Sequence, residues 1–150
     1  MPDPPGSGRV RALLLDIEGT TTPQDFVTRV LFPYAREHVR EFLFRHAPTD
    51  HALRDDLAVL FSRSEAGDLT PSIRAYFDTT TGAKGEAESY RKIARALGHA
   101  PADVLFLSDA TGELDAAREA GLATGLCERQ GRAPSFPGHP MVRSFDEVLP

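Results

Sequence analysis

Two carboxylates follow a short apolar run near the start of the chain. Residues 12–15 read Ala-Leu-Leu-Leu, and they lead into Asp16, Glu18 and Gly19. Such a run is typical of a buried parallel strand, and open α/β sheets bind ligands at the carboxyl ends of their strands. Neighbouring carboxylates repel each other unless a cation or a proton lies between them. The spacing therefore predicts a Mg²⁺ site, the alternative being a solvated acidic turn.

A second apolar run, residues 104–109, also ends in an acid, Asp109. Between the two acidic strand ends lies Lys84, at the start of a predicted helix over residues 84–97. The dipole at a helix N-terminus favours anions, so a lysine there indicates a compensating group such as a bound phosphate or an aspartyl-phosphate. The alternative is an ordinary solvated surface lysine.

The remaining pattern indicates the elements that must position these side chains. Apolar runs, caps and breakers predict a doubly wound, mainly parallel, Rossmann-like α/β sheet. We expect strands at residues 10–16, 74–78, 104–109 and 123–127, helices at 25–45, 84–97, 111–120 and 144–149, and a loop at 130–140.

The composition limits the classes of function. With 150 residues, 41% of them hydrophobic, the chain can bury a core without disulfides, and its single Cys127 suits a reducing cytoplasm. The net charge of −5 gives no support for nucleic-acid binding, and no apolar run has the length of a membrane span. Residues 1–9 are predicted to form a disordered leader, ahead of a core domain at 10–150.

Together these segments resemble the haloacid dehalogenase superfamily, and within it the enolase-phosphatase (acireductone synthase) family of methionine salvage. The narrowest signal is Glu18, where most of the superfamily carries a second aspartate. The matching text comprises residues 15–23, 30–34, 64–71, 76–79, 84, 88–94 and 106–109.

The resemblance implies a hydrolase with a defined set of site residues. Asp16 would be the nucleophile that forms an aspartyl-phosphate, and Glu18 the general acid and base. Mg²⁺ would be held by the carboxylates of Asp16 and Asp109 and by the backbone carbonyl of Glu18. Lys84 would neutralise the phosphoryl oxygens of a small phosphorylated diketo substrate, which the family enolises before dephosphorylation.

The chain departs from the family in its middle. The cap domain and the Ser-Ser-Gly turn that binds phosphate at the end of a second core strand are not recognisable, which implies a shortened core with the cap largely deleted. Residues 57–62 could substitute for the lost strand, ending in Ser62, but the resemblance favours the helix and loop that follow it. We therefore expect strand 74–78 to pair directly with strand 10–16.

Two other classes of protein stay open at this stage. A receiver domain also gathers acids and a lysine at a sheet edge, although its lysine follows the acceptor strand, whereas Lys84 precedes the strand ending in Asp109. A non-catalytic remnant of a phosphatase is the other. We expect a monomer, with a dimer through the uncovered edge of the shortened sheet as the alternative.

Overall fold

The computed structural model describes residues 10–17, 19–22, 29, 61–62, 67–128 and 138–148. The chain divides into two compact units, the first made of residues 1–26 with 78–150 and the second of residues 27–77. Both acidic strand ends and Lys84 belong to the first unit. Its elements therefore determine the geometry of the candidate site.

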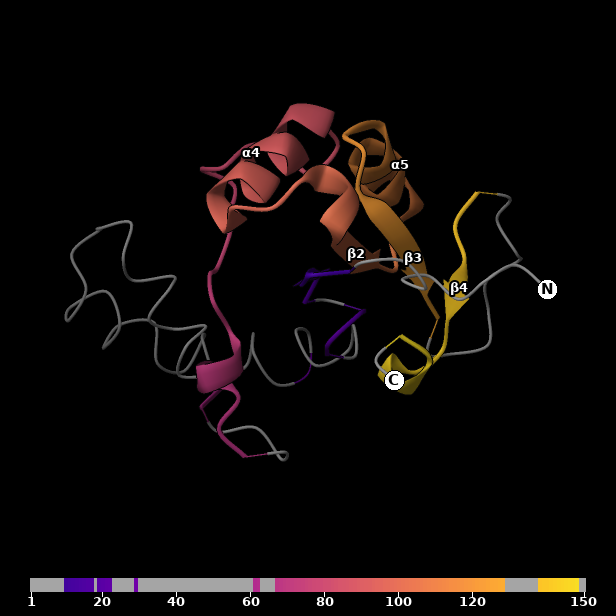
Figure 1. Ribbon diagram of the computed structural model, residues 1–150. Coiled ribbons are helices and arrows are strands. Elements are labelled where there is room, and N and C mark those ends of the chain that lie inside the picture. The colour runs from indigo at the N-terminus through magenta and orange to yellow at the C-terminus, as the bar shows by residue number, and fades with distance from the viewer. Residues whose placement is uncertain are drawn as a thin grey trace. The chain divides into compact units, whose positions relative to one another are not determined.

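The first unit contains a four-stranded parallel sheet in the order β1-β2-β3-β4 (Figure 1). Its central strand β2, Val104–Ser108, is buried along its whole length, as expected for a parallel strand covered on both faces. The others are β1 (Ala12–Leu15), β3 (Ala123–Cys127) and β4 (Met141–Val142). This confirms the predicted α/β class.

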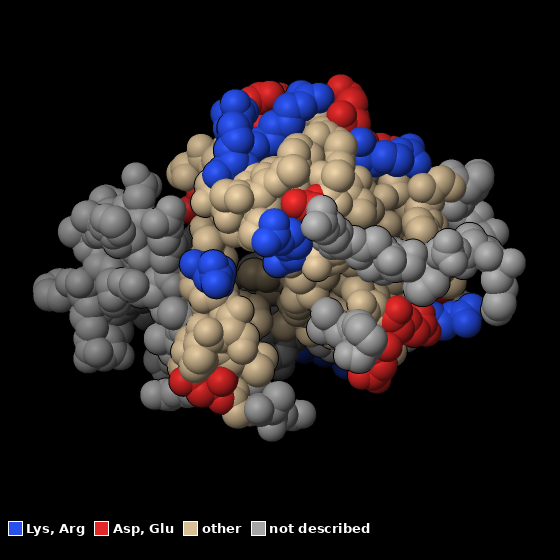
Figure 2. All heavy atoms as spheres, viewed as in Figure 1, with Lys and Arg blue, Asp and Glu red and all other residues tan. Residues whose placement is uncertain are grey.

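Helices α4 (Ala87–Leu97) and α5 (Thr111–Glu119) lie over one face of the sheet (Figure 1). The ring of Tyr90 on α4 packs against Phe106 on β2, with ring centroids 5.1 Å apart. The outer surface of these helices carries both basic and acidic side chains (Figure 2). Ion pairs form within each helix. They are Arg91 and Arg95 with Glu88, and Arg118 with Asp115.

Alternate residues of the same strands face the other way and form a second layer of the core. Leu105 and Leu107 of β2 cluster there with Cys127 and Val142. Phe145 and Val148, in and beside the short 3₁₀ helix η4 (Phe145–Glu147), pack against this cluster. Ser144 caps η4 by accepting a hydrogen bond from the backbone N–H of Asp146.

Several predicted elements agree closely with the structure. The strand at 123–127 matches β3, and helix 111–120 ends one residue early in α5. The helix predicted at 84–97 begins at Ala87 instead, because the chain is extended at Glu86, and this leaves Lys84 in a preceding turn. The 3₁₀ helix η3, Pro101–Asp103, leads directly into β2.

The strand predicted at residues 74–78 is wrong, and so is its pairing with the first strand. Residues 73–78 form no helix or strand, and β1 pairs with β2 in the register Leu15↔Leu107. A short apolar segment such as Ala-Tyr-Phe at 75–77 does not by itself specify a strand or its partner, and β2 offers β1 a longer apolar run.

The second unit is described at residues 29, 61–62 and 67–77. Phe61 and Ser62 are helical, in agreement with the favoured interpretation, whereas residues 57–60 of the alternative strand lie outside the described residues. The 3₁₀ helix η2, Thr70–Ser72, follows, and the rings of Phe61 and Tyr76 stack with centroids 6.2 Å apart. The predicted helix at 25–45 lies outside the described residues except for Arg29.

Gly98 ends α4 in a left-handed conformation with φ of 72°, and no described residue outside the local backbone comes within 4 Å of the position a Cβ would take. We expect Gly98→Ala to lower the free energy of unfolding by about 1–2 kcal/mol, because a side chain is strained there. Gly112→Ala, inside α5 and equally unobstructed, should raise it by up to about 1 kcal/mol. Urea unfolding measures both free energies. A change of the same sign in the two variants would contradict the left-handed conformation of Gly98 or the helical conformation of Gly112.

Candidate active site

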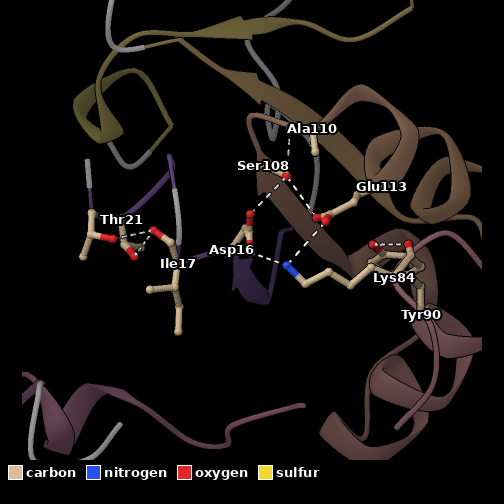
Figure 3. Close-up of polar contacts among 9 residues, drawn as sticks. Asp16, Ile17, Thr21, Lys84, Tyr90, Ser108, Ala110 and Glu113 are labelled. Carbon is tan, nitrogen blue, oxygen red and sulfur yellow. Dashed lines mark hydrogen bonds and ion pairs between the residues drawn. The ribbon is translucent and has the colours of Figure 1, made fainter. Parts of the chain in front are cut away.

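Asp16 lies at the carboxyl end of β1, beside the end of β2. Its backbone N–H donates to the carbonyl of Leu107 at 3.0 Å, which continues the ladder one residue beyond the strand. This pairing brings the Asp16 carboxylate next to Ser108, whose hydroxyl lies 3.5 Å from Asp16 Oδ2 (Figure 3). The two strand ends thus meet at one edge of the sheet, as the sequence predicts.

Lys84 reaches Asp16 across the sheet edge, although 68 residues separate them in the chain. Its Nζ lies 2.7 Å from Asp16 Oδ1 and 3.4 Å from Oε1 of Glu113, so one ammonium serves two carboxylates (Figure 3). Burial lowers the pKa of Lys84, but the hydrogen bond and charge of Asp16, and then Glu113, raise it above its usual value. The ammonium therefore stays charged throughout the physiological pH range.

Glu113 and Ser108 are site residues that the sequence analysis did not identify. Ser108 Oγ lies 3.1 Å from Glu113 Oε2 and accepts a hydrogen bond from the backbone N–H of Ala110. Glu113 stands four residues after Asp109, in the first turn of α5. That helical spacing, directly after an acidic strand end, is the signal that could have found it.

Burial raises the pKa of the Glu113 carboxyl, and the charge of Asp16 raises it further. Lys84 and the hydrogen bond with Ser108 oppose this shift, but the net effect is a raised pKa. Ionised Glu113 is therefore held against an unfavourable environment. A carboxylate in such a position is more often kept for function than for stability.

The turn after Asp16 brings Asp109 close to the same site. Gly19 has φ of 74°, and a Cβ on it would lie 2.0 Å from Asp109 Oδ2, so only glycine fits this approach. The hydroxyls of Thr21 and Thr22 both donate to the carbonyl of Ile17, which makes them turn residues. The buried Thr20 hydroxyl, by contrast, has no partner for a hydrogen bond among the residues that the structure describes.

This chemistry suits a hard divalent cation. The carboxylates of Asp16 and Asp109 follow adjacent strands, and the buried hydroxyl of Thr20, four residues after Asp16, has no hydrogen-bond partner among the described residues. In the described part of the chain no three His, Cys, Asp or Glu side chains form a metal-binding group, but Glu18 lies outside that part. The carboxylate and hydroxyl oxygens present are nevertheless the kinds of donor that Mg²⁺ prefers.

The structure thus brings together three of the four predicted site residues. Asp16 and Lys84 form an ion pair, Asp109 lies against the turn that follows Asp16, and Glu18 is outside the described residues. No helix among the described residues is long and apolar enough to cross a membrane.

Several known proteins are similar to this chain in sequence, and one solved structure is similar to it in fold. No family model matches the chain. Enolase-phosphatase E1 of Azotobacter vinelandii is 34% identical over an alignment that covers 94% of this chain and 98% of the relative. Enolase-phosphatase E1 of Pseudomonas aeruginosa strain UCBPP-PA14 is 32% identical over 93% and 98%. The crystal structure of the UTR4 protein of Saccharomyces cerevisiae, 26% identical, superposes with a TM-score of 0.72 over 90% of this chain and 98% of that one.

A parallel α/β sheet with acids at adjacent strand ends, together with these relatives, defines a phosphatase of the haloacid dehalogenase superfamily. Within that superfamily the chain belongs to the enolase-phosphatase family. The resemblance seen in the sequence is thereby confirmed, and membership of this family speaks against a receiver domain.

Glu113 should make stability depend on pH. The pKa of this carboxyl is higher in the folded protein than in the unfolded chain. Such a group stabilises the fold at a pH below its pKa in the unfolded chain, and this contribution is lost as the pH rises through its pKa in the folded protein. Glu113→Gln removes this loss, so the unfolding free energy of the variant minus that of the wild type should increase from about pH 3 to about pH 7. Urea unfolding across this range measures it, with Glu119→Gln on the exposed end of α5 as control. A difference that falls with pH would show that ionised Glu113 stabilises the fold.

Proposed function

We propose that this chain is a Mg²⁺-dependent phosphatase that hydrolyses a small phosphorylated substrate through an aspartyl-phosphate on Asp16. The observation that carries the proposal is the 2.7 Å contact between Lys84 and Asp16 at the sheet edge. The relatives named enolase-phosphatase support a phosphorylated diketo compound of methionine salvage as the substrate. The lone buried Cys127 suits activity in a reducing cytoplasm.

Asp16 is the nucleophile in this mechanism. Its carboxylate oxygen attacks the substrate phosphorus, and the bond from phosphorus to the substrate oxygen breaks. The Asp16 side chain is only 11% exposed, so few water molecules compete for its oxygens. Lys84 pairs with the Asp16 carboxylate and offers its ammonium to the phosphoryl oxygens that approach it.

Glu18 moves the protons. It donates a proton to the oxygen that leaves with the substrate, and it then takes one from the water that attacks the aspartyl-phosphate. That second step releases inorganic phosphate and restores Asp16. The assignment rests on the family resemblance and on the position of Glu18, two residues after the nucleophile.

Mg²⁺ would be held by the carboxylates of Asp16 and Asp109 and by the backbone carbonyl of Glu18. When bound there, it would offset the repulsion between the nucleophile and the phosphate. Gly19 contributes by admitting Asp109 to the turn, since a Cβ at this position would meet Asp109 at 2.0 Å. Glu113 connects α5 to the site, because its carboxylate accepts a hydrogen bond from Ser108 and pairs with Lys84.

The shortened middle of the chain bears on how fast this chemistry runs. The alignment with the Azotobacter relative extends over 224 positions, more than the 150 residues of this chain, which supports a segment missing from its interior. A lost phosphate-binding serine turn removes donors that would stabilise the transition state, and a lost cap leaves water free to enter.

Phosphate release from a generic aryl phosphate ester tests the proposal. With Mg²⁺ the protein should release phosphate over many turnovers, and EDTA should abolish the reaction. Asp16→Asn should abolish it as well without unfolding the protein, because an amide lacks both the charge and the nucleophilicity of a carboxylate. One equivalent of phosphate would indicate a receiver-like acceptor, none in the wild type would indicate a remnant, and turnover by Asp16→Asn would place the chemistry elsewhere.

The shortened core should lower catalytic efficiency on the family substrate. Removing one transition-state donor costs about 2.7–4 kcal/mol, or roughly 10²–10³ in rate. We therefore expect kcat/KM at least roughly 10²-fold below that of a capped enolase-phosphatase measured under the same conditions. Equal efficiency would mean that another part of this chain replaces the missing donors.

A further inference from the structure

The loop that carries Lys84 is held by side chains of helix α4. The carbonyl of Ala83 accepts a hydrogen bond from Ser89 Oγ at 2.8 Å, and the carbonyl of Lys84 itself accepts one from the hydroxyl of Tyr90, also at 2.8 Å. Consecutive carbonyls of the loop are thus bound by consecutive residues of the first turn of α4. The loop backbone passes so close to Ser89 that a Cβ on Gly82 would lie 2.3 Å from its oxygen.

Both donors are buried, whereas Lys84 is not. Ser89 is 4% and Tyr90 3% exposed, while the Lys84 side chain is 60% exposed and has little packing of its own to fix its position. Its ammonium must nevertheless reach a carboxylate on another element. The backbone of Lys84 therefore has to be held from α4.

Tyr90 connects this loop to the sheet that carries the nucleophile. Its ring packs on Phe106 of β2, and Phe106 pairs in register with Leu14, two residues before Asp16. The contacts form a closed path from Asp16 through β1, Phe106, Tyr90 and Lys84 back to Asp16. Figure 3 shows its part from Tyr90 through Lys84 to Asp16. The backbone of Lys84 is thereby tied to a ring that is packed in the core.

We infer that Tyr90, assisted by Ser89, is a positioning residue that sets the place of the Lys84 ammonium at Asp16 by binding the backbone of the Lys84 loop. This inference rests on the proposed role of Lys84 in holding the phosphoryl group. Burial, and then the charges of Glu113 and Asp16, raise the pKa of Tyr90 well above its usual value. The hydroxyl accordingly keeps its proton and remains a donor wherever the enzyme is active.

The test compares Tyr90→Phe with Tyr76→Phe. The first variant keeps the ring on Phe106 and removes the hydroxyl that binds Lys84. The second removes a buried hydroxyl that has no hydrogen-bond partner in the described part of the chain. Ser89→Ala is a second variant that loosens the same loop, in case Tyr90→Phe folds poorly. Thermal unfolding followed by circular dichroism checks that each protein is folded.

Two readouts separate this inference from the proposed function. Lys84 and Lys92 are the two lysines of the chain, so the ratio of their acetylation rates by acetic anhydride, read by peptide mass spectrometry, reports whether Lys84 is held by Asp16. The ratio Lys84:Lys92 should rise several-fold in Tyr90→Phe and in Ser89→Ala and stay unchanged in Tyr76→Phe. In the same samples kcat/KM on the aryl phosphate ester should fall by up to about tenfold in the first two variants only.

An unchanged ratio in both loop variants would overturn the inference, whatever their activity. A raised ratio with unchanged kcat/KM would overturn it too, because Lys84 would then move without consequence for catalysis. If the wild type releases no phosphate but the ratio still rises, the positioning of Lys84 by Tyr90 stands and the proposed function fails.

Discussion

The parallel pairing of β1 with β2 is the constraint on which the rest of the site depends. Leu15 lies opposite Leu107, and the bond from Asp16 N–H to the Leu107 carbonyl continues that register to the first residue beyond the strand. A slip by one residue would turn the Asp16 side chain to the other face of the sheet. The same slip would also move every side chain of Ala12–Leu15 to the opposite face, so the site depends on this one register.

Negative charge exceeds positive charge among the described side chains at this edge of the sheet. Lys84 pairs with both Asp16 and Glu113 there, and Asp109 lies against Gly19 in the turn that follows Asp16. Because the Lys84 side chain is 60% exposed, its ion pair with Asp16 should add less than about 1 kcal/mol to stability. The residual negative charge is better understood as a place for a cation and a phosphate than as a device that holds the fold.

Local patterns predicted the elements nearest the site well. The segments 104–109 and 123–127 contain β2 and β3, the first because it is a continuous apolar run and the second because it follows a helix that ends at a glycine, Gly121. Asp16, Lys84 and Asp109 could be identified from strand ends and from the family resemblance. The strand at 74–78 could not be judged from the chain alone, because pairing depends on which partner offers its edge. The two-residue β4 was too short to predict.

The residues that the sequence did not identify, Ser108, Glu113 and Tyr90, were missed for one physical reason. Ser108 and Glu113 belong to the site only because α5 starts directly after β2 and turns its first acidic residue back toward Asp16. Tyr90 acts through its hydroxyl on a loop six residues earlier, a contact that depends on where α4 begins. Sequence spacing identifies such residues as helix positions, and only the three-dimensional arrangement gives them partners.

In the proposed mechanism Asp16 carries the phosphoryl group between the two steps. Acid quenching of the enzyme during turnover of a phosphate ester, followed by peptide mass spectrometry, measures this directly, since acid preserves an acyl phosphate long enough for detection. We expect a phosphorylated peptide with the modification on Asp16, absent without substrate. A phosphoryl group on Asp109 or Glu113, or phosphate release in one step with no modified peptide, would contradict it.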